Sequence, residues 1–179
     1  AFSTIGLLKE RREVTVAVTG CVASQEGDKL RKRFPFVDFV LGPDHVQKLP
    51  ELLRNENTFH DLSDYEFPTV VNQESRVKSY VTIMKGCDNV CSFCIVPMVR
   101  GPEISRAPEE ILSEIFLLEE RGVGEIILLG QNVNSYGRNT KTNFSQLLRL
   151  IDQKTHVGRI RYTSPHPQNL SVDLMRLYG

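Results

Sequence analysis

The sequence predicts an α/β protein in which short strands alternate with amphipathic helices. Residues 13–54 follow the order strand, helix, strand, helix, and residues 79–179 continue as strand, loop, helix, strand, helix, strand, helix. The strands of the second half are short and apolar, which is typical of strands buried on both faces of a parallel sheet. Three such βα units make about half of a (β/α) barrel, which closes with eight.

The first half is expected to hold five elements, placed by their apolar spacing: a helix over 3–12, strands over 13–20 and 37–42, and helices over 24–34 and 43–55. Valines at positions 14, 16 and 18 alternate as in a strand. Ser24 is expected to cap the helix that follows, and Pro50 to break or restart the last helix. The basic run at 29–33 is interpreted as a solvated helix face.

Residues 55–77 have little apolar periodicity and are rich in Asn, Ser, Asp, Pro and Gln, so they are interpreted as a linker between domains 1–54 and 78–179. The second domain is expected to hold strands over 79–86, 124–130 and 158–164 and helices over 107–122, 143–153 and 169–178. The clearest element is the helix over 107–122. Pro108 suits its first turn, a stripe of Ile111, Ile115 and Leu118 faces inward, and Gly122 ends it.

The composition of the 179 residues excludes few classes of protein. The chain is 40% hydrophobic and 25% charged, with a formal net charge of zero and a pI of about 7.1, so its overall charge does not indicate a nucleic-acid or membrane partner. No apolar run approaches the ~18 residues of a membrane span and no signal peptide opens the sequence. We expect a cytoplasmic protein, or one of the mitochondrial matrix if the source is eukaryotic. The sequence starts at Ala1 and stops within an apparent helix, so we expect a piece of a longer protein that is unstable or inactive by itself.

Three of the four cysteines, Cys87, Cys91 and Cys94, have the spacing C-x3-C-x2-C directly after a predicted strand. Thiolates are soft ligands, so we expect them to bind zinc or an iron–sulfur cluster. A structural zinc would need a fourth ligand such as His45, His60 or Cys21, all of which precede the strand, and three unrelated buried thiols are the other alternative. A cubane cluster with one open iron fits the count of three best.

Residues 84–101, "MKGCDNVCSFCIVPMVRG", followed by "SR" at 105–106, resemble the signature of the radical S-adenosylmethionine methylthiotransferases. In that family the three cysteines bind a [4Fe-4S] cluster whose open iron binds the amino and carboxylate groups of S-adenosylmethionine. An electron from the reduced cluster then yields methionine and a 5′-deoxyadenosyl radical. The resemblance continues through residues 15–43, 126–137 and 159–167, with Pro102 as a departure in a loop.

The resemblance implies a fold and a branch of the family. The fold is the C-terminal part of a parallel-sheet N-terminal methylthiotransferase domain, followed by the first half of a radical-SAM (β/α) barrel. The segment "LGQNVNSYG" at 129–137 is similar to the branch that adds a methylthio group to C2 of N6-isopentenyladenosine at position 37 of tRNA. Other branches act on threonylcarbamoyl-adenosine in tRNA or on an aspartate of a ribosomal protein, and a non-enzymatic iron–sulfur or zinc module is the alternative outside the family.

The resemblance also implies residue roles. Cys87, Cys91 and Cys94 bind the radical cluster, and Cys21 matches one ligand of an auxiliary [4Fe-4S] cluster whose other two ligands would precede Ala1. No catalytic residue is expected beyond the cluster ligands. The other candidates each have two interpretations. Gln131 and Asn132 either bind S-adenosylmethionine or cap their loop, and Phe93 either contacts the adenine or shields the cluster. Arg100 and Arg106 either bind a tRNA phosphate or pair with Glu103 or Glu110, and His166 is either a site residue or a structural one.

The partners implied by the resemblance are the anticodon loop of a tRNA, two molecules of S-adenosylmethionine, an external electron donor and a sulfur source. No membrane partner is expected. An anticodon-loop base is already single-stranded and is easily splayed out of its stack, which suits an enzyme that must reach C2 of the ring.

Overall fold

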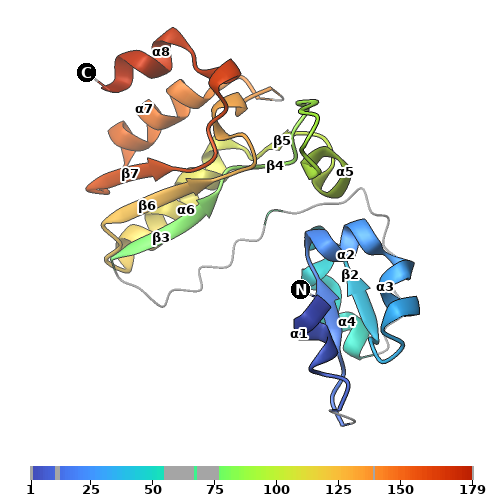
Figure 1. Cartoon of the computed structure of the whole chain (residues 1–179). Coiled ribbons are helices and arrows are strands. Elements are labelled where there is room, and N and C mark those ends of the chain that lie inside the picture. The colour runs from blue at the N-terminus through green and yellow to red at the C-terminus, as the bar shows by residue number, and fades with distance from the viewer. Residues whose placement is uncertain (1, 11–12, 55–66, 68–76, 139, 179) are drawn as a thin grey trace. The chain divides into compact units, whose positions relative to one another are not determined.

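The computed structural model describes residues 2–10, 13–54, 67, 77–138 and 140–178 (Figure 1). The chain divides into two compact units, each described by itself below. Unit 1 comprises residues 1–65 with 98–100, and unit 2 comprises residues 66–97 with 101–179. Apart from Phe67 and Val77, the predicted linker over 55–77 lies outside the described residues and stays a prediction.

Unit 1 is built on two short parallel strands, β1 (Ala17–Thr19) and β2 (Phe39–Leu41), with Val18 opposite Val40. Its core contains Ile5, Val16, Leu30 and Val37. The other elements of the unit are helical and are α1 (Phe2–Gly6), α2 (Cys21–Glu26), α3 (Asp28–Arg33), the 3-10 helix η1 (Pro43–Lys48) and α4 (Leu49–Leu53).

Several expectations for unit 1 are corrected in detail. The predicted helix over 24–34 is two helices, because Gly27 between them has φ 48°, a conformation that ends a helix and that glycine adopts without strain. The first of them starts at Cys21, so Ser24 lies inside a helix and is not its N-cap. The first strand is shorter than predicted, since Val14 is exposed and pairing starts at residue 17.

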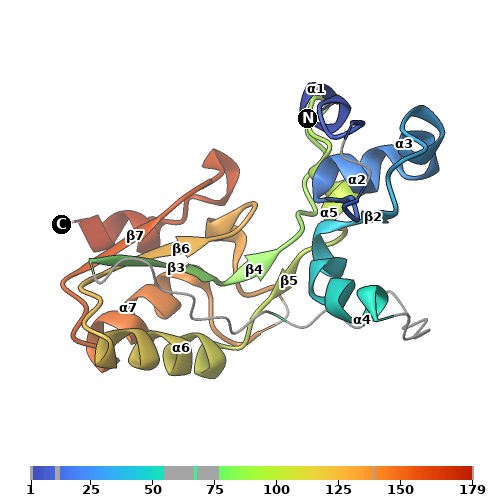
Figure 2. The same cartoon turned by 90° about the horizontal axis from the view of Figure 1, so that it is seen from below.

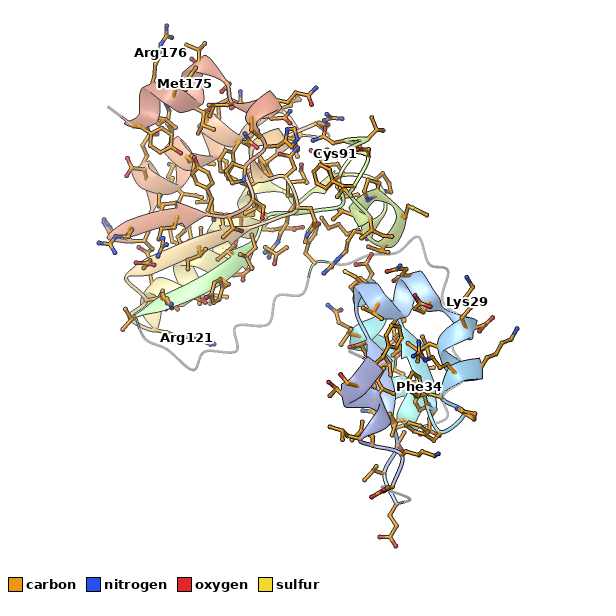
Figure 3. The ribbon with its side chains drawn as sticks, viewed as in Figure 1. Lys29, Phe34, Cys91, Arg121, Met175 and Arg176 are labelled. Carbon is orange, nitrogen blue, oxygen red and sulfur yellow. The ribbon has the colours of Figure 1, made fainter. Side chains whose placement is uncertain are left out.

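The restart of the last helix of unit 1 is confirmed, because η1 ends at Lys48 and α4 carries Pro50 in its first turn. Of the helix expected over 3–12, the residues up to 10 form only the short α1, with Leu7 after it exposed, and residues 11–12 lie outside the described residues. The basic run on α3 is solvated as predicted, because Lys29 and residues 31–33 are exposed. Figure 3 labels Lys29. Arg33 also covers the ring of Phe2, with its guanidinium carbon 4.6 Å from the ring centroid.

Unit 2 confirms the predicted parallel sheet. The strands β3 (Lys78–Thr82), β6 (Glu125–Leu129) and β7 (Arg159–Tyr162) lie in this order, and each pair is parallel. The crossover helices α6 (Pro108–Glu120) and α7 (Phe144–Lys154) lie side by side on one face of this sheet (Figure 2). Because all three strands run the same way, the loops that follow them meet at one edge of the sheet, the edge where parallel α/β proteins place their chemistry.

The core of unit 2 forms between this sheet and its helices. Ile111, Ile115 and Leu118 of α6 are completely or almost completely buried, which confirms the predicted stripe. Pro108 occupies the first turn of α6, where its missing N–H removes no hydrogen bond. Helix α7 begins with a capping box, in which the Asn143 side chain accepts from the Gln146 amide and the Gln146 side chain accepts in return.

A small substructure that the sequence did not predict frames the loop after β3. Strand β4 (Met84–Lys85) pairs antiparallel with β5 (Ile104–Ser105), and helix α5 (Val96–Arg100) lies between them in the sequence. Strands of two residues are too short to show an alternation of apolar and polar residues, so the sequence does not predict them. The chain continues after β7 through three short helices, η3 (Pro167–Asn169), α8 (Val172–Met175) and η4 (Arg176–Tyr178), and η2 (Val133–Ser135) follows β6.

Candidate functional site

The three clustered cysteines lie on the loop between β4 and α5, at the carboxyl end of the parallel strands. Figure 1 labels β4 and α5, and Figure 3 labels Cys91. Cys87 is buried and Cys91 and Cys94 are half-buried, and all three are free thiols. The amide of Cys94 donates to the carbonyl of Cys91 at 3.0 Å, which closes a turn between the second and third cysteines. The amide of Cys87 donates to the carbonyl of Gly101 at 3.2 Å and ties the start of the loop to its return segment.

Gly86 is the first residue of the cysteine loop, and its backbone conformation and close packing require glycine. Its φ is 73°, in the region that favours glycine. A Cβ atom at this position would lie 1.9 Å from the carbonyl oxygen of Pro102, which is backbone and cannot turn away. The backbone of the loop therefore approaches residue 102 more closely than any other amino acid at position 86 would allow.

Gln131, which follows β6, is hydrogen-bonded to Gly86. Its side-chain oxygen Oε1 accepts a hydrogen bond from the Gly86 amide at 2.6 Å, across 45 residues of sequence. Asn132 is almost completely buried, and its Nδ2 donates to Oδ1 of Asn169 at 3.0 Å. Its Oδ1 is buried without a hydrogen-bond partner among the described residues. The structure thus brings both predicted amides to the cysteine edge of the sheet.

A polar cluster that sequence reasoning missed surrounds the loop. Asp88 accepts from the Glu103 amide at 2.9 Å through Oδ1 and from Arg138 at 2.9 Å through Oδ2. Oε2 of Glu103 accepts from the Ser135 hydroxyl at 2.5 Å and lies 3.7 Å from the Arg138 guanidinium. Burial raises the pKa of Glu103, against the opposing effects of the Ser135 hydrogen bond and the charge of Arg138, and nearby Asp88 adds to the rise. No spacing in the sequence predicts this cluster, because its members lie up to 50 residues apart.

Two more hydrogen bonds fasten the segment after β6 to the segment around β5. The hydroxyl of Tyr136 donates to the carbonyl of Arg106 at 2.7 Å, and the amide of Gly137 donates to Oγ of Ser105 at 2.9 Å. Burial raises the pKa of the Tyr136 hydroxyl, which keeps it a donor. The segment that carries Gln131 and Asn132 is therefore held against the strand that closes the cysteine loop.

Arg106 forms the carboxylate contacts that were one of its two predicted interpretations. Its side chain is 2% exposed and forms ion pairs with Glu110, at 3.4 Å, and with Glu114. It also donates to the Thr82 carbonyl at 3.3 Å. A guanidinium buried between two carboxylates favours the ion-pair interpretation for Arg106, and the phosphate interpretation stays a prediction. Arg100 is half-buried at the end of α5, and its role stays a prediction.

Phe93 is 91% exposed and Val90 is 96% exposed, both on the cysteine loop. Neither adenine contact nor cluster shielding is tested for Phe93 by this position. His166 comes into the site from the loop after β7: its Nε2 lies 3.8 Å from Sγ of Cys91 (Figure 3 marks Cys91). The sequence had placed His166 at this edge without a partner.

The comparisons with known proteins agree with this geometry. The family model described as "Radical SAM superfamily" matches residues 81–176, which include β3 from Val81, the cysteine loop, β6 and β7. The chain belongs to the radical SAM superfamily. Among the described residues, none of the helices is both long and apolar enough to cross a membrane.

Curated relatives extend the similarity over nearly the whole chain. A protein of Anaeromyxobacter sp. (strain Fw109-5) is 46% identical over 180 residues, 96% of this chain and 39% of its own length. A protein of Myxococcus xanthus (strain DK1622) is 43% identical over 182 residues, 96% of this chain and 39% of its own length. A protein of Francisella philomiragia is 42% identical over 185 residues, 97% and 42% respectively. All three are named tRNA-2-methylthio-N(6)-dimethylallyladenosine synthase, and the chain spans about two fifths of their length.

The residues present fit the cofactors of a radical SAM protein. Three free thiols share one loop, and iron–sulfur clusters are held by cysteine thiolates. Within the described ranges, no three His, Cys, Asp or Glu side chains converge on a point suitable for one metal ion. In a cubane each thiolate binds a different iron, so the ligands need not converge in this way. The unpartnered buried Oδ1 of Asn132 is an acceptor that suits a cationic group such as the ammonium of S-adenosylmethionine.

Cys21 belongs to unit 1, where it is half-buried as the first residue of α2. Gly20 before it has φ 99°, so the chain turns sharply where β1 ends and α2 begins. Of the other ligands considered for a zinc site, His45 lies in η1 of the same unit and His60 lies outside the described residues. The auxiliary-cluster role of Cys21 stays a prediction.

Proposed function

We propose that the protein is a radical SAM methylthiotransferase that adds a methylthio group to C2 of N6-isopentenyladenosine at position 37 of tRNA. The observation that carries this proposal is the extent of the similarity. The relatives named for this activity match 96–97% of the chain, which includes unit 1, whereas the general superfamily match starts at residue 81. A radical SAM enzyme outside the methylthiotransferases would need to resemble them only in unit 2.

Each part of the site has a role in this proposal. Cys87, Cys91 and Cys94 hold a [4Fe-4S] cluster, which together with S-adenosylmethionine supplies a 5′-deoxyadenosyl radical when both are bound. Gln131 fixes the first cysteine by accepting from the Gly86 amide, and its Nε2 group remains to donate to a carboxylate. Asn132 offers its unpartnered Oδ1 to the ammonium of the cofactor.

The remaining partners follow from the proposed reaction. The substrate base is that of an anticodon loop, and the exposed apolar tip formed by Val90 and Phe93 is suited to contact with an unstacked base. Cys21 is proposed as one ligand of a second [4Fe-4S] cluster, which would handle the inserted sulfur. An external electron donor and a sulfur source complete the set, and the reaction takes place in the cytoplasm.

Two other functions are kept as outcomes of the test. A ribosomal-protein methylthiotransferase would share the radical chemistry but modify an aspartate. A non-enzymatic iron–sulfur or zinc module would not cleave S-adenosylmethionine at all.

The test uses the whole protein that contains this sequence, reconstituted anaerobically with iron and sulfide. Iron and sulfide are measured first, and then 5′-deoxyadenosine after reduction with dithionite in the presence of S-adenosylmethionine. Isopentenylated tRNA and the ribosomal protein are offered in parallel and analysed by mass spectrometry. The proposal predicts iron, 5′-deoxyadenosine and methylthiolated tRNA. Product on the ribosomal protein alone, or one zinc with no iron, would contradict it.

A further inference from the structure

We propose that His166 donates a hydrogen bond from Nε2 to the thiolate of Cys91 and thereby raises the reduction potential of the cluster that this thiolate helps to hold. This inference rests on the proposed cluster at Cys87, Cys91 and Cys94 and adds a positioning residue to it. The observation behind it is the distance of 3.8 Å between Nε2 of His166 and Sγ of Cys91, across 75 residues of sequence.

The two nitrogens of the His166 ring have separate partners. Nδ1 accepts a hydrogen bond from the Gln168 amide at 3.2 Å and caps the short helix η3. A nitrogen that accepts an N–H carries a lone pair, so the proton of the neutral ring sits on the other nitrogen. Nε2 is therefore an N–H donor, and the sulfur of Cys91 is the acceptor that it faces. The capping role of His166 is fulfilled by Nδ1 and leaves Nε2 unexplained.

The backbone of His166 is clamped independently of its ring. Its amide donates to Oδ1 of Asn134 at 2.8 Å, and its carbonyl accepts from Nδ2 of the same side chain at 2.8 Å. Asn134 is buried in η2, directly after the segment that carries Gln131. Asn134 thus holds the loop after β7 against the loop after β6. The fixed backbone of His166 positions its imidazole beside the cysteine loop.

The consequence for a cluster follows from its charge. Reduction adds a negative charge that is shared with the sulfur ligands, and a hydrogen bond to such a ligand stabilises the reduced state more than the oxidised state. Removing the donor is therefore expected to make the cluster harder to reduce. Among the described residues, Cys91 is the one cysteine of the triad whose sulfur has a side-chain hydrogen-bond partner, so it is singled out from Cys87 and Cys94.

The test compares His166→Phe, which has no donor, and His166→Gln, which keeps a side-chain N–H, with the wild-type whole protein reconstituted under anaerobic conditions. His156→Phe is the matched control, because His156 is an exposed histidine of the same unit. Asn134→Ser is the second route to the same result, since it releases the backbone clamp and leaves the imidazole in place. Iron content, the midpoint potential followed by electron paramagnetic resonance, and the pulsed-resonance coupling between the reduced cluster and ¹⁵N-labelled histidine are measured.

We expect His166→Phe to bind iron and to lower the reduced-to-oxidised ratio at a fixed potential about tenfold, which is about 59 mV for a one-electron couple. We also expect the weak ¹⁵N coupling to disappear in His166→Phe. His166→Gln should keep part of the wild-type midpoint potential, and His156→Phe should change neither the potential nor the coupling. If His166→Phe binds no iron, Asn134→Ser decides through the same two readouts. An iron-loaded variant with unchanged potential and coupling overturns this inference alone, whereas wild-type protein that binds no iron overturns the proposed function together with it.

Discussion

The side-chain oxygen of Gln131 accepts a hydrogen bond from the amide of Gly86 at 2.6 Å, which joins the turn after β6 to the residue that precedes the first cysteine. The two residues are 45 positions apart: Gly86 directly follows β4, and Gln131 follows β6, the strand beside β3 in the parallel sheet. The start of the cysteine loop is therefore fixed by the neighbouring strand as well as by its own. This relationship gives Gln131 a positioning role that is separate from any contact with a cofactor.

Gln131→Ala is predicted to loosen the cysteine loop without unfolding unit 2. A single lost hydrogen bond of this kind is worth about 0.5–1.5 kcal/mol, with a further cost for the Gly86 amide left without its acceptor. We expect a rise in the iron lost to a chelator and a fall of about tenfold in the rate of 5′-deoxyadenosine formation. Gln153→Ala is the control, because Gln153 is exposed on α7. Equal iron retention in the two variants would contradict the positioning role.

Gly86→Ala is predicted to abolish cluster binding. The added Cβ would lie 1.9 Å from a backbone carbonyl oxygen, and the positive φ adds about 1–2 kcal/mol of strain. Gly122→Ala is the matched control, since Gly122 has φ 83° but open space where its Cβ would lie. Iron content after reconstitution separates the two effects: the control should keep its cluster and lose only stability. Normal iron content in Gly86→Ala would contradict the close packing of the loop.

Arg106→Met is predicted to destabilise the protein strongly by a route unrelated to tRNA. It leaves the buried carboxylate of Glu114 without its ion-pair partner, and breaking a buried pair in this way costs about 3–5 kcal/mol. The double variant Arg106→Met with Glu114→Met should recover most of that loss, because no unpaired charge remains. Denaturant unfolding measures both. A single variant of normal stability but weakened tRNA binding would support the phosphate interpretation for Arg106 instead.

The stability of the protein should depend on pH through Glu103. Burial raises the pKa of this carboxyl in the folded protein above its ordinary value of 4.5, so between these two pKa values the folded state binds more protons than the unfolded state. The free energy of unfolding therefore falls as the pH rises through this window and stays lowered above it. Glu103→Gln cannot ionise and should lack this fall.

The pH dependence is checked by denaturant unfolding of wild type and Glu103→Gln from pH 4 upward. Ser135→Ala serves as a second variant, because the Ser135 hydroxyl hydrogen bond lowers the pKa of Glu103 and its removal should widen the window toward higher pH. Parallel stability curves for wild type and Glu103→Gln, or a wild-type curve that rises through the window, would contradict the assignment.

The parts of the fold that the sequence predicted are those with long apolar periodicity. The stripe of Ile111, Ile115 and Leu118 and the apolar run of β6 specify a buried helix and a buried parallel strand whatever surrounds them. The antiparallel pair of β4 and β5 and the short α5 were missed, because two to five residues hold too little of any period. The break at Gly27 was missed because the backbone conformation of a glycine does not show in its sequence context.

The cysteine triad could be predicted from its spacing, whereas the contacts between residues distant in the sequence could not. Cys87, Cys91 and Cys94 share one loop and are visible as a spacing. The bonds of Gln131 to Gly86 and of His166 to Cys91 cross 45 and 75 residues and depend on the order of strands in the sheet. Arg106 has two interpretations in the sequence, and its burial between two carboxylates favours the ion-pair interpretation.

The central claim is tested most directly by the mass of the nucleoside at position 37 of isopentenylated tRNA after incubation with the whole reconstituted protein, S-adenosylmethionine and dithionite. We expect the mass of 2-methylthio-N6-isopentenyladenosine, and we expect it to be absent with a Cys87→Ala variant that cannot hold the cluster. Unmodified N6-isopentenyladenosine from a protein that carries its cluster and cleaves S-adenosylmethionine would contradict it.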